Sequence, residues 1–407
     1  MIRNKIVFLQ IENLIYKMQK LIVRSKQTLV KEYLNVFPAV AILGSRQCGK
    51  STLIKMMTKQ MPKMLYLDLQ NREDLAKLSE PSLFFKSNAD KVICLDEIQQ
   101  VPDLFSILRS EIDRDRRVGR FILLGSASRE LLQNTSETLA GRIGLIDMTP
   151  FTFSELSTDK KFALNRFWLR GGYPDSYLAL SDEYSSLWRE SFIRTYIERD
   201  IPQFGFQITA RQMLRLMSML AHLHGQMLNC SKLGESLGLT HPTIKRYVDV
   251  LEQTYLIRTL PPFFVNTKKR IIKSPKIYVR DSGLLHQLLQ IKTFNNLLGH
   301  PIFGASWEGF VVENVCSSLQ DAEFSFFRSA LGEEMDLIVQ KNSKLVAIEC
   351  KASTAPQLTQ GFWKTIDLIK PDKTFVVAPI EQKYELRDNV QVVNLGDLLQ
   401  LLNEILN

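Results

Sequence analysis

One eight-residue run constrains the fold of this chain more than any other feature. Residues 44–51 read Gly-Ser-Arg-Gln-Cys-Gly-Lys-Ser and match the phosphate-loop pattern G-x-x-x-x-G-K-S/T at every fixed position. The apolar residues 39–43 before the loop predict a buried strand, and residues 52–60 after it predict a helix. Further β-type runs alternate with helical patterns as far as residue 148. This alternation predicts an α/β domain with a mainly parallel sheet.

The residue types in this loop predict a nucleotide site. Gly44 and Gly49 let the backbone turn consecutive N–H groups toward a phosphate, and the following helix adds the positive end of its dipole. Lys50 is expected to reach the β- and γ-phosphates, and the Ser51 hydroxyl to ligate Mg²⁺. The expected cofactor is therefore ATP with Mg²⁺. The residues predicted to contact it run along the loop into the helix: Gly44, Ser45, Arg46, Gln47, Cys48, Gly49, Lys50, Ser51 and Thr52.

A second motif supplies the carboxylates that such a site needs. Residues 92–95 predict another buried strand, and Asp96 and Glu97 follow it directly. Asp96 is predicted to hold Mg²⁺ through water, and Glu97 to orient or deprotonate the attacking water. Ser126 follows a further predicted strand and is expected to sense the γ-phosphate, although a simple turn serine remains the alternative.

Charge that develops on the transferred phosphoryl group requires a cation in addition to Lys50 and Mg²⁺. Arg142 is the first candidate for this catalytic role, and Arg170, which precedes a Gly-Gly break, is the second. Arginines are also common surface residues. The sequence therefore leaves open whether either one acts, and whether it acts on its own site or on that of a neighbouring molecule.

Composition and segment lengths exclude several classes of protein. Hydrophobic residues make up 45% of the 407 residues and charged residues 23%, which is ordinary for a globular protein. No apolar run reaches the roughly 18 residues of a membrane span, so no membrane partner is expected. The N-terminal stretch lacks a small-residue cleavage site, and Met18 offers a second start beside Met1. The 5 cysteines form no C-x-x-C pair, which predicts free thiols in a reducing cytoplasm and no zinc site.

Positive charge is concentrated in one segment of the chain. Residues 211–280 hold twelve basic and three acidic residues, and their net charge of +9 equals that of the whole chain. Within this segment, residues 231–238 and 242–253 predict the two helices of a helix-turn-helix. Residues 255–260 and 263–272 predict a β-ribbon after it.

Six side chains of this basic segment are predicted to contact nucleic acid. Three would face outward from the second helix: Thr243, Lys245 and Arg246. Three would lie at the tip of the ribbon: Lys268, Lys269 and Arg270. The pattern predicts a partner that is duplex DNA, because a basic hairpin beside a recognition-type helix suits the phosphate backbones on each side of a groove. A protein-binding module or a rigid lid remains the alternative.

The C-terminal part carries a third pattern of charged residues. Asp336 opens one predicted strand, and Glu349 and Lys351 close the next. On neighbouring strands the two carboxylates would lie side by side and share a divalent metal, with Glu308 as a further ligand. Lys351 would polarise the attacking water or the scissile phosphate. The arrangement is typical of the restriction-endonuclease-like fold, but Glu-x-Lys is also a frequent surface pattern, so a catalytically silent binding module remains the alternative.

Together these motifs resemble one family, the prokaryotic AAA-type ATPases of the AAA+ superfamily that carry a C-terminal domain of unknown function. Besides the phosphate loop, the resemblance rests on five short runs: Leu-Asp-Glu-Ile-Gln at 95–99, Leu-Gly-Ser-Ala-Ser at 124–128, Leu-Ala-Gly-Arg at 139–142, Arg-Gly-Gly-Tyr-Pro at 170–174 and Tyr-Ile-Glu-Arg-Asp at 196–200. It extends from about residue 21 to the C-terminus. It implies nucleotide roles for Lys50, Ser51, Asp96, Glu97 and Ser126.

The resemblance implies a P-loop NTPase core with a parallel sheet, then a winged helix, then a C-terminal restriction-endonuclease-like α/β domain. We expect the ATPase core at residues 20–155, a helical lid or linker at 156–205, the winged helix-turn-helix at 206–280 and the nuclease-like domain at 281–407. The leading hypothesis is an ATP-hydrolysing enzyme that acts on DNA. Its alternative is an ATP-dependent switch that recruits a protein or DNA partner and has a catalytically silent nuclease-like domain. Assembly into a homo-oligomer stays open.

Overall fold

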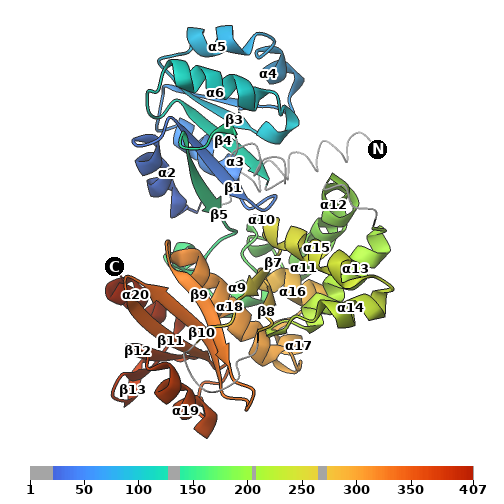
Figure 1. Ribbon diagram of the computed structural model, residues 1–407, viewed down its shortest axis with the longest axis vertical. Helices are drawn as coiled ribbons and strands as arrows, with labels where there is room; N and C mark the ends of the chain where they lie inside the picture. The colour runs from blue at the N-terminus through green and yellow to red at the C-terminus, as the bar shows by residue number, and fades with distance from the viewer. Residues whose placement is uncertain (1–21, 127–137, 204–207, 265–272, 407) are drawn as a thin grey trace.

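The phosphate loop lies at the carboxyl edge of a five-stranded parallel sheet. The computed structural model describes residues 22–126, 138–203, 208–264 and 273–406, and Figure 1 shows this sheet in the upper part of the molecule. The strands follow the spatial order β2-β3-β4-β1-β5, and all of them run parallel. They span Ala39–Gly44 (β1), Met64–Asp68 (β2), Val92–Asp96 (β3), Phe121–Ser126 (β4) and Ile143–Met148 (β5). All five strands that the sequence predicts here are present.

Helices cover this sheet on both faces because its strands are apolar on both faces. In β1, Ala39, Ala41 and Leu43 belong to one buried cluster, whereas Val40 and Ile42 belong to another. Successive side chains of a strand point to opposite faces, so the two clusters are the two sides of the sheet. Helices α5 and α6 pack into the first cluster, and α2 and α3 into the second. The helices of this unit are α2 Lys26–Leu34, α3 Lys50–Thr58, α4 Arg72–Ala76, α5 Pro81–Ser87, η1 Ile98–Gln100 and α6 Leu104–Arg114.

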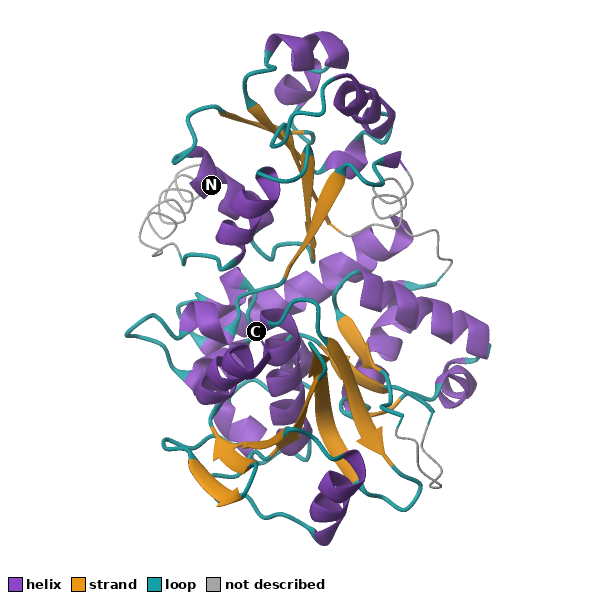
Figure 2. Ribbon diagram, turned by 60° about the vertical axis from the view of Figure 1, so that its left-hand side comes forward, coloured by secondary structure: helices purple, strands orange, loops and turns teal. Residues whose placement is uncertain are grey.

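A mainly helical region with a small antiparallel sheet follows the first unit (Figure 2). Its strands lie in the order β6-β8-β7 and span Gln226–Met227 (β6), Ile257–Leu260 (β7) and Lys276–Val279 (β8). One helical segment, η2, has π-helical geometry. The helices are α8 Phe153–Leu156, α9 Leu164–Arg170, α10 Pro174–Tyr177, α11 Asp182–Thr195, η2 Tyr196–Asp200, α12 Ile201–Gln203, α13 Ala210–His222, α14 Cys230–Leu237, α15 His241–Gln253, α16 Ser282–Leu288 and α17 Phe294–Leu298.

Helices α14 and α15 form the predicted pair, joined by a short turn. Gly238 ends α14 with a φ of 67°, in the left-handed region that glycine adopts most easily. The Thr240 side chain caps α15 by accepting a hydrogen bond from the Thr243 N–H. Ile244 and Leu251 are buried, as their helical spacing predicts.

The first strand of the predicted β-ribbon is present: β7 lies within the predicted residues 255–260 and pairs antiparallel with β8. Most of the predicted second strand, residues 265–272, lies outside the described residues. Residues Lys268, Lys269 and Arg270, which we predicted at the ribbon tip, lie outside the described residues. Lys276, one of the basic residues of segment 211–280, is only 1% exposed and lies inside β8.

A six-stranded mixed sheet forms the C-terminal part of the molecule. Its spatial order is β13-β14-β12-β11-β10-β9, in which β11, β12 and β14 run parallel and the other neighbours pair antiparallel. The sequence predicts β9 to β12 but not the last two strands. The elements are α18 Phe303–Ser318, β9 Glu323–Arg328, β10 Glu334–Lys341, β11 Lys344–Cys350, α19 Gln360–Ile369, β12 Lys373–Val377, β13 Tyr384–Arg387, β14 Val390–Val393 and α20 Leu395–Leu406.

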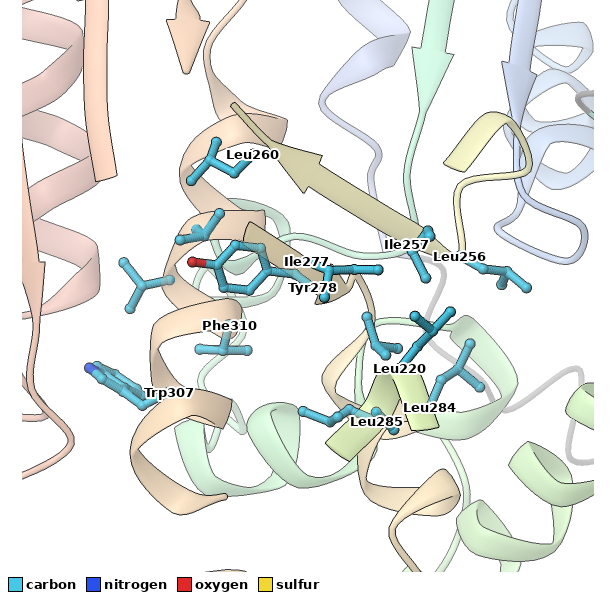
Figure 3. Packing of buried hydrophobic residues seen from close by; sticks show 14 of the residues in the cluster. Leu220, Leu256, Ile257, Leu260, Ile277, Tyr278, Leu284, Leu285, Trp307 and Phe310 are labelled. Carbon is cyan, nitrogen blue, oxygen red and sulfur yellow. The ribbon is translucent and has the colours of Figure 1, made fainter. Parts of the chain in front are cut away.

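One apolar cluster joins the middle region to the C-terminal sheet. Its members run from Phe151 to Leu406. Figure 3 shows Tyr278 of β8 near Phe310 of α18, and Leu220 of α13 near Leu285 of α16, all within this cluster. The predicted boundary after residue 280 therefore falls inside a shared core. None of the helices in the described part of the chain has the length and apolar character needed to cross a membrane.

Candidate nucleotide-binding site

A cavity of about 260 Å³ lies beside the phosphate loop. Part of its wall is apolar and is formed by Ile22, Met56, Phe151, Pro174 and Leu178. The remaining wall is polar and includes Glu97. Several predicted contact residues line it: Arg46, Gln47, Gly49, Lys50, Ser51 and Thr52. A cavity that combines an apolar wall with a few convergent polar groups suits a nucleotide, which has an aromatic base at one end and phosphates at the other.

The shape of the loop depends on its two glycines. A Cβ atom at Gly44 would lie 2.1 Å from the carbonyl oxygen of Met148 on β5, so no other residue fits there without a shift. Gly49 has a φ of 102°, a conformation that other residues rarely adopt. Gly49 caps α3, so the loop leads directly into the positive end of a helix dipole.

Lys50 is the first residue of α3, and its ammonium group lies against the loop. Its Nζ atom donates hydrogen bonds to the carbonyl oxygens of Gly44 at 3.0 Å and Ser45 at 2.8 Å. The residue is only 7% exposed. Neutral carbonyls therefore hold this cation in place, and an anionic phosphate would be a stronger partner for it.

Arg24, in the segment that precedes α2, stabilises the phosphate loop. Its guanidinium donates to the carbonyl oxygen of Cys48 at 2.7 Å and to that of Thr149 at 2.5 Å, and it pairs with Glu155 at 3.0 Å. It also lines the cavity. Our sequence analysis missed Arg24, because a single arginine ahead of the first strand has no spacing that separates it from a surface residue.

The predicted carboxylates lie at the end of β3. Asp96 is 3% exposed and accepts hydrogen bonds from the Glu97 backbone N–H at 2.9 Å and from the Tyr66 hydroxyl. The Ser51 hydroxyl also hydrogen-bonds to this phenol. Burial, and then the contact with Asp96, raise the pKa of Tyr66 above its ordinary value. Tyr66 thus links the two predicted Mg²⁺ ligands, a role that its position inside an apolar strand did not reveal.

Glu97 lines the cavity and has an uncommon backbone conformation, with a φ of 56°. Its carboxylate accepts a hydrogen bond from the Gln99 side-chain amide. Burial raises the pKa of Glu97 above its ordinary value, while Gln99 and Lys50 act in the opposite direction and only partly offset the effect. A carboxylate with a raised pKa is a better proton acceptor, as a general base requires.

These donors fit a magnesium ion. The Ser51 hydroxyl and the Asp96 carboxylate are hard oxygen ligands of the kind that Mg²⁺ prefers. Ser51 would hold the ion directly and Asp96 through water. When bound, the ion would offset negative charge on the phosphates.

The strand order places Ser126 where the sequence predicts it. Strand β4 lies between β1 and β3, and the backbone of Ser126 pairs with Gly44 at the carboxyl edge. The Ser126 side chain lies outside the described residues, so its role as a phosphate sensor stays a prediction.

Arg142 does not belong to this site. It precedes β5 at the amino edge of the sheet, where its carbonyl oxygen accepts a hydrogen bond from the Ala39 N–H. Its guanidinium pairs with Asp113 at 2.7 Å. Because the phosphate loop lies at the opposite edge of the parallel strands, Arg142 does not reach the loop of its own chain. A role at the site of a neighbouring molecule stays a prediction.

Arg170 is also engaged elsewhere. It is 8% exposed, pairs with Asp182 at 2.6 Å and donates to the carbonyl oxygen of Ala179 at 2.5 Å. These contacts tie the end of α9 to the start of α11. Arg170 therefore supports the fold of the helical region and does not point to the phosphate loop.

The basic middle segment is less positive at its surface than its composition suggests. Arg258 and Arg280 both pair with Glu313 of α18, at 3.0 and 2.7 Å. On α15, Lys245 and Arg246 are exposed and Thr243 is half-buried. Lys245 also pairs with Asp249 at 3.2 Å. The outward orientation that we predicted for these two basic residues is confirmed.

The C-terminal carboxylates gather as predicted at the ends of neighbouring strands. Strands β10 and β11 pair with Leu337 opposite Ile348, which brings Asp336 beside Glu349. The Cys350 N–H donates to Asp336 at 2.9 Å, and Lys351 lies 2.6 Å from Glu349.

A lysine from the middle region lies among these carboxylates. The Lys276 Nζ atom lies 2.8 Å from Glu308, 2.7 Å from Glu334 and 3.4 Å from Asp336. Burial lowers the pKa of Lys276, but Glu308 and Asp336 outweigh that effect and raise it well above its ordinary value. Within the described ranges, no group of three or more His, Cys, Asp or Glu residues is arranged to hold a metal ion. In this structure Lys276 lies among these carboxylates, and the predicted metal site at Glu308, Asp336 and Glu349 stays a prediction.

Three family models match successive parts of this chain. The sequence model of a family described as an AAA domain matches residues 36–157. Two families described as domains of unknown function, DUF8612 and DUF4143, match residues 161–295 and 303–398. A Walker-type ATPase of Pyrococcus abyssi is structurally similar at a TM-score of 0.47 and 14% identity, over 67% of this chain and 97% of that one.

Two relatives match nearly the whole chain. Uncharacterized proteins of Mycobacterium bovis and Mycobacterium tuberculosis are each 37% identical to it over 376 residues, which is 92% of this chain and 84% of the relative. The chain therefore belongs to the same family as these mycobacterial proteins, and its residues 36–157 match an AAA domain.

Proposed function

We propose that the protein binds Mg²⁺–ATP in the 260 Å³ cavity and hydrolyses it there. The single observation that carries this proposal is the state of Lys50. Its ammonium is 7% exposed, and in the described part of the chain it forms hydrogen bonds with backbone carbonyls and no ion pair. A buried charge without a counter-ion costs free energy, which an anionic ligand at this position would offset.

The other residues of the site have roles that follow from their chemistry. Gly49 and the start of α3 present backbone N–H groups to the phosphates. Ser51 and Asp96 supply the oxygens that hold Mg²⁺. Glu97 accepts a proton from the attacking water, and its burial in the cavity wall supports this role. The apolar wall around Phe151 accommodates the base.

Replacement of Glu97 by glutamine should separate binding from turnover. We expect Glu97→Gln to keep its affinity for ATP and to lose about 100- to 10,000-fold in turnover, because the amide cannot accept the proton. Lys50→Ala should lose affinity for ATP itself. Nucleotide titration and phosphate release measure the two quantities. Glu73→Gln, an exposed carboxylate change in the same unit, is the matched control, and equal turnover in Glu97→Gln and Glu73→Gln would contradict the assignment.

As the pH is lowered, the rate of ATP hydrolysis should begin to fall at a higher pH than it would if Glu97 had the pKa of an ordinary glutamate. Below its pKa Glu97 is protonated and cannot act as a base, and burial places that pKa above the ordinary value of 4.5. The acid limb of kcat/KM for ATP should therefore lie above pH 4.5 in the wild type and be absent from the residual activity of Glu97→Gln. An acid limb that persists unchanged in that variant would show that another group titrates.

A second proposal concerns the partner. We infer that α14 and α15 act as a winged helix-turn-helix that contacts duplex DNA, in line with the capped turn at Thr240 and the exposed Lys245 and Arg246. The support is limited to these side chains and to the overall basic charge of residues 211–280, because Arg258, Arg280 and Lys276 form internal ion pairs.

Charge reversal on α15 tests this proposal. Wild-type protein should bind duplex DNA at low salt, and Lys245→Glu with Arg246→Glu should weaken binding and reduce the slope of log affinity against log salt by about 0.9 for each phosphate that the variant no longer neutralises. Fluorescence anisotropy at several salt concentrations measures both. Lys63→Glu, on the distant ATPase unit, is the control. Undetectable DNA binding at low salt, or identical slopes for the double variant and the control, would rule out this surface.

A third proposal concerns the C-terminal carboxylates. We propose that they form a structural cluster around Lys276 and that this region serves as a binding module, in line with the switch alternative above. The cluster joins β8 of the middle region to α18 and β10, so its charges contribute to the contact between the two regions. An ammonium at this position competes with a divalent cation for the same oxygens.

The variant Lys276→Met should leave Glu308 and Asp336 without the ammonium that lies between them. We expect a loss of about 3–5 kcal/mol in the free energy of unfolding near neutral pH, because like charges remain buried together. Added Mn²⁺ should restore part of the loss in Lys276→Met and should not stabilise the wild type. Chemical denaturation measures both effects, with the surface variant Lys344→Met as the control. Equal stabilisation of the wild type by Mn²⁺ would show that the wild-type cluster is a metal site.

A further inference from the structure

Arg46 lies in the phosphate loop but its side chain points to another part of the molecule. Its guanidinium pairs with Asp200 of η2 at 2.8 Å, across 154 positions of sequence. The two side chains are 33% and 18% exposed, so the pair is half-buried. Arg46 lines the nucleotide cavity and also a smaller cavity of about 70 Å³, which Trp188, Phe192 and Asp200 share. This one side chain therefore lies at the boundary between the two cavities.

The partner segment has an unusual backbone. Residues Tyr196–Asp200 form a π-helical turn between α11 and α12, and such turns often occur at functional sites. The same residues, Tyr-Ile-Glu-Arg-Asp, are one of the runs on which the resemblance to AAA-type ATPases rests. The proposed nucleotide chemistry gives them no role. At one end of the turn Asp200 holds Arg46. At the other end the Tyr196 hydroxyl forms a 2.6 Å hydrogen bond with Thr254, the residue that follows α15.

We propose that Arg46 is a nucleotide-sensing residue. In the nucleotide-free protein it pairs with Asp200. When a nucleotide binds, Arg46 pairs with the phosphates instead, and the π-helical turn loses this contact with the phosphate loop. This inference rests on the proposed function, because it requires a triphosphate in the cavity. Arg46 then supplies the second cation that phosphoryl transfer needs and that Arg142 and Arg170 do not supply from within the same chain.

Charge and position support an exchange of partners. Arg46 already lines the nucleotide cavity, together with Lys50 and Glu97. A nucleoside triphosphate carries several negative charges. Two of its phosphate oxygens can accept bidentate hydrogen bonds from a guanidinium, as the two oxygens of a carboxylate do. Asp200 offers a single carboxylate and is partly desolvated. The stronger anion therefore displaces the weaker one when both compete for the same guanidinium.

The same exchange connects the ATPase core to α15. When Asp200 loses its partner, it becomes an uncompensated half-buried charge next to Trp188 and Phe192, which favours a rearrangement of the turn. Tyr196 lies at the start of the same turn and contacts the residue after α15. The conformation of this turn can therefore be influenced from two sites, the nucleotide cavity through Asp200 and α15 through Tyr196. Coupling between two sites requires such a shared element.

A double-mutant cycle on nucleotide affinity tests this inference. Asp200→Asn removes the competitor for Arg46, so we expect ATP to bind about two- to fivefold more tightly than to the wild type, which is the range for an ion pair of this exposure. In the Arg46→Gln background the same Asp200→Asn change should leave the affinity for ATP unaltered. Adenosine, which lacks phosphates, should bind equally to all four proteins. Glu198→Gln, on the same turn but paired with Arg194 at the surface, is the matched control.

Hydrogen exchange provides a second readout that does not depend on the stability of the Asp200 variant. In the wild type, a non-hydrolysable ATP analogue should speed exchange of the amides of residues 196–200, and in Arg46→Gln it should not. Tighter ATP binding by Asp200→Asn in both backgrounds, unchanged or weaker binding in the wild-type background, or slower exchange of these amides with the analogue would overturn the inference while leaving the proposed ATPase function intact. Failure of the wild type to bind ATP at all would overturn both.

Discussion

The hydrogen bonds between the Lys50 ammonium and the carbonyls of its own loop are the interaction on which the proposed chemistry depends. The positive charge is buried at the carboxyl edge of a parallel sheet, and neutral oxygens hold it there. An anion can therefore bind to this cation. Ser51, Asp96 and Glu97 lie at the same edge of the sheet. The strand order explains this convergence, because β1 and β3 end at the same edge with β4 between them. Arg24 and the two loop glycines hold the backbone of the phosphate loop in the conformation that places Lys50 and Ser51.

The C-terminal cluster shows the opposite electrostatic situation. There the carboxylates of Glu308, Glu334 and Asp336 already surround a cation, Lys276, which comes from another region of the chain. The Lys50 ammonium forms no direct ion pair within the described residues, whereas the Lys276 ammonium lies against three carboxylates and offsets part of their charge. This difference underlies the two proposals, ligand binding at the phosphate loop and a structural role for the C-terminal cluster.

The fold was largely predictable because its elements depend on local periodicity. The strands of the first sheet are continuous apolar runs, and α15 has a capping threonine and a buried stripe that can be read directly from the sequence. Side-chain partners were not predictable in the same way. Arg142, Arg170 and Lys276 each pair with a carboxylate of another element, and no spacing rule indicates which arginines or lysines form such pairs. Tyr66 and Arg24 were missed for the converse reason, since a tyrosine in an apolar strand and a lone arginine give no signal until the fold brings them to the site.

The most direct test of the central claim is a crystal structure of the protein with Mg²⁺ and a non-hydrolysable ATP analogue. The account predicts that the triphosphate lies in the cavity beside α3 and that the Lys50 Nζ atom has left the carbonyls of Gly44 and Ser45 for the phosphate oxygens. It also predicts a metal ion at Ser51, within one water of Asp96. A nucleotide bound elsewhere, or a Lys50 ammonium still hydrogen-bonded to both carbonyls beside a bound triphosphate, would contradict it.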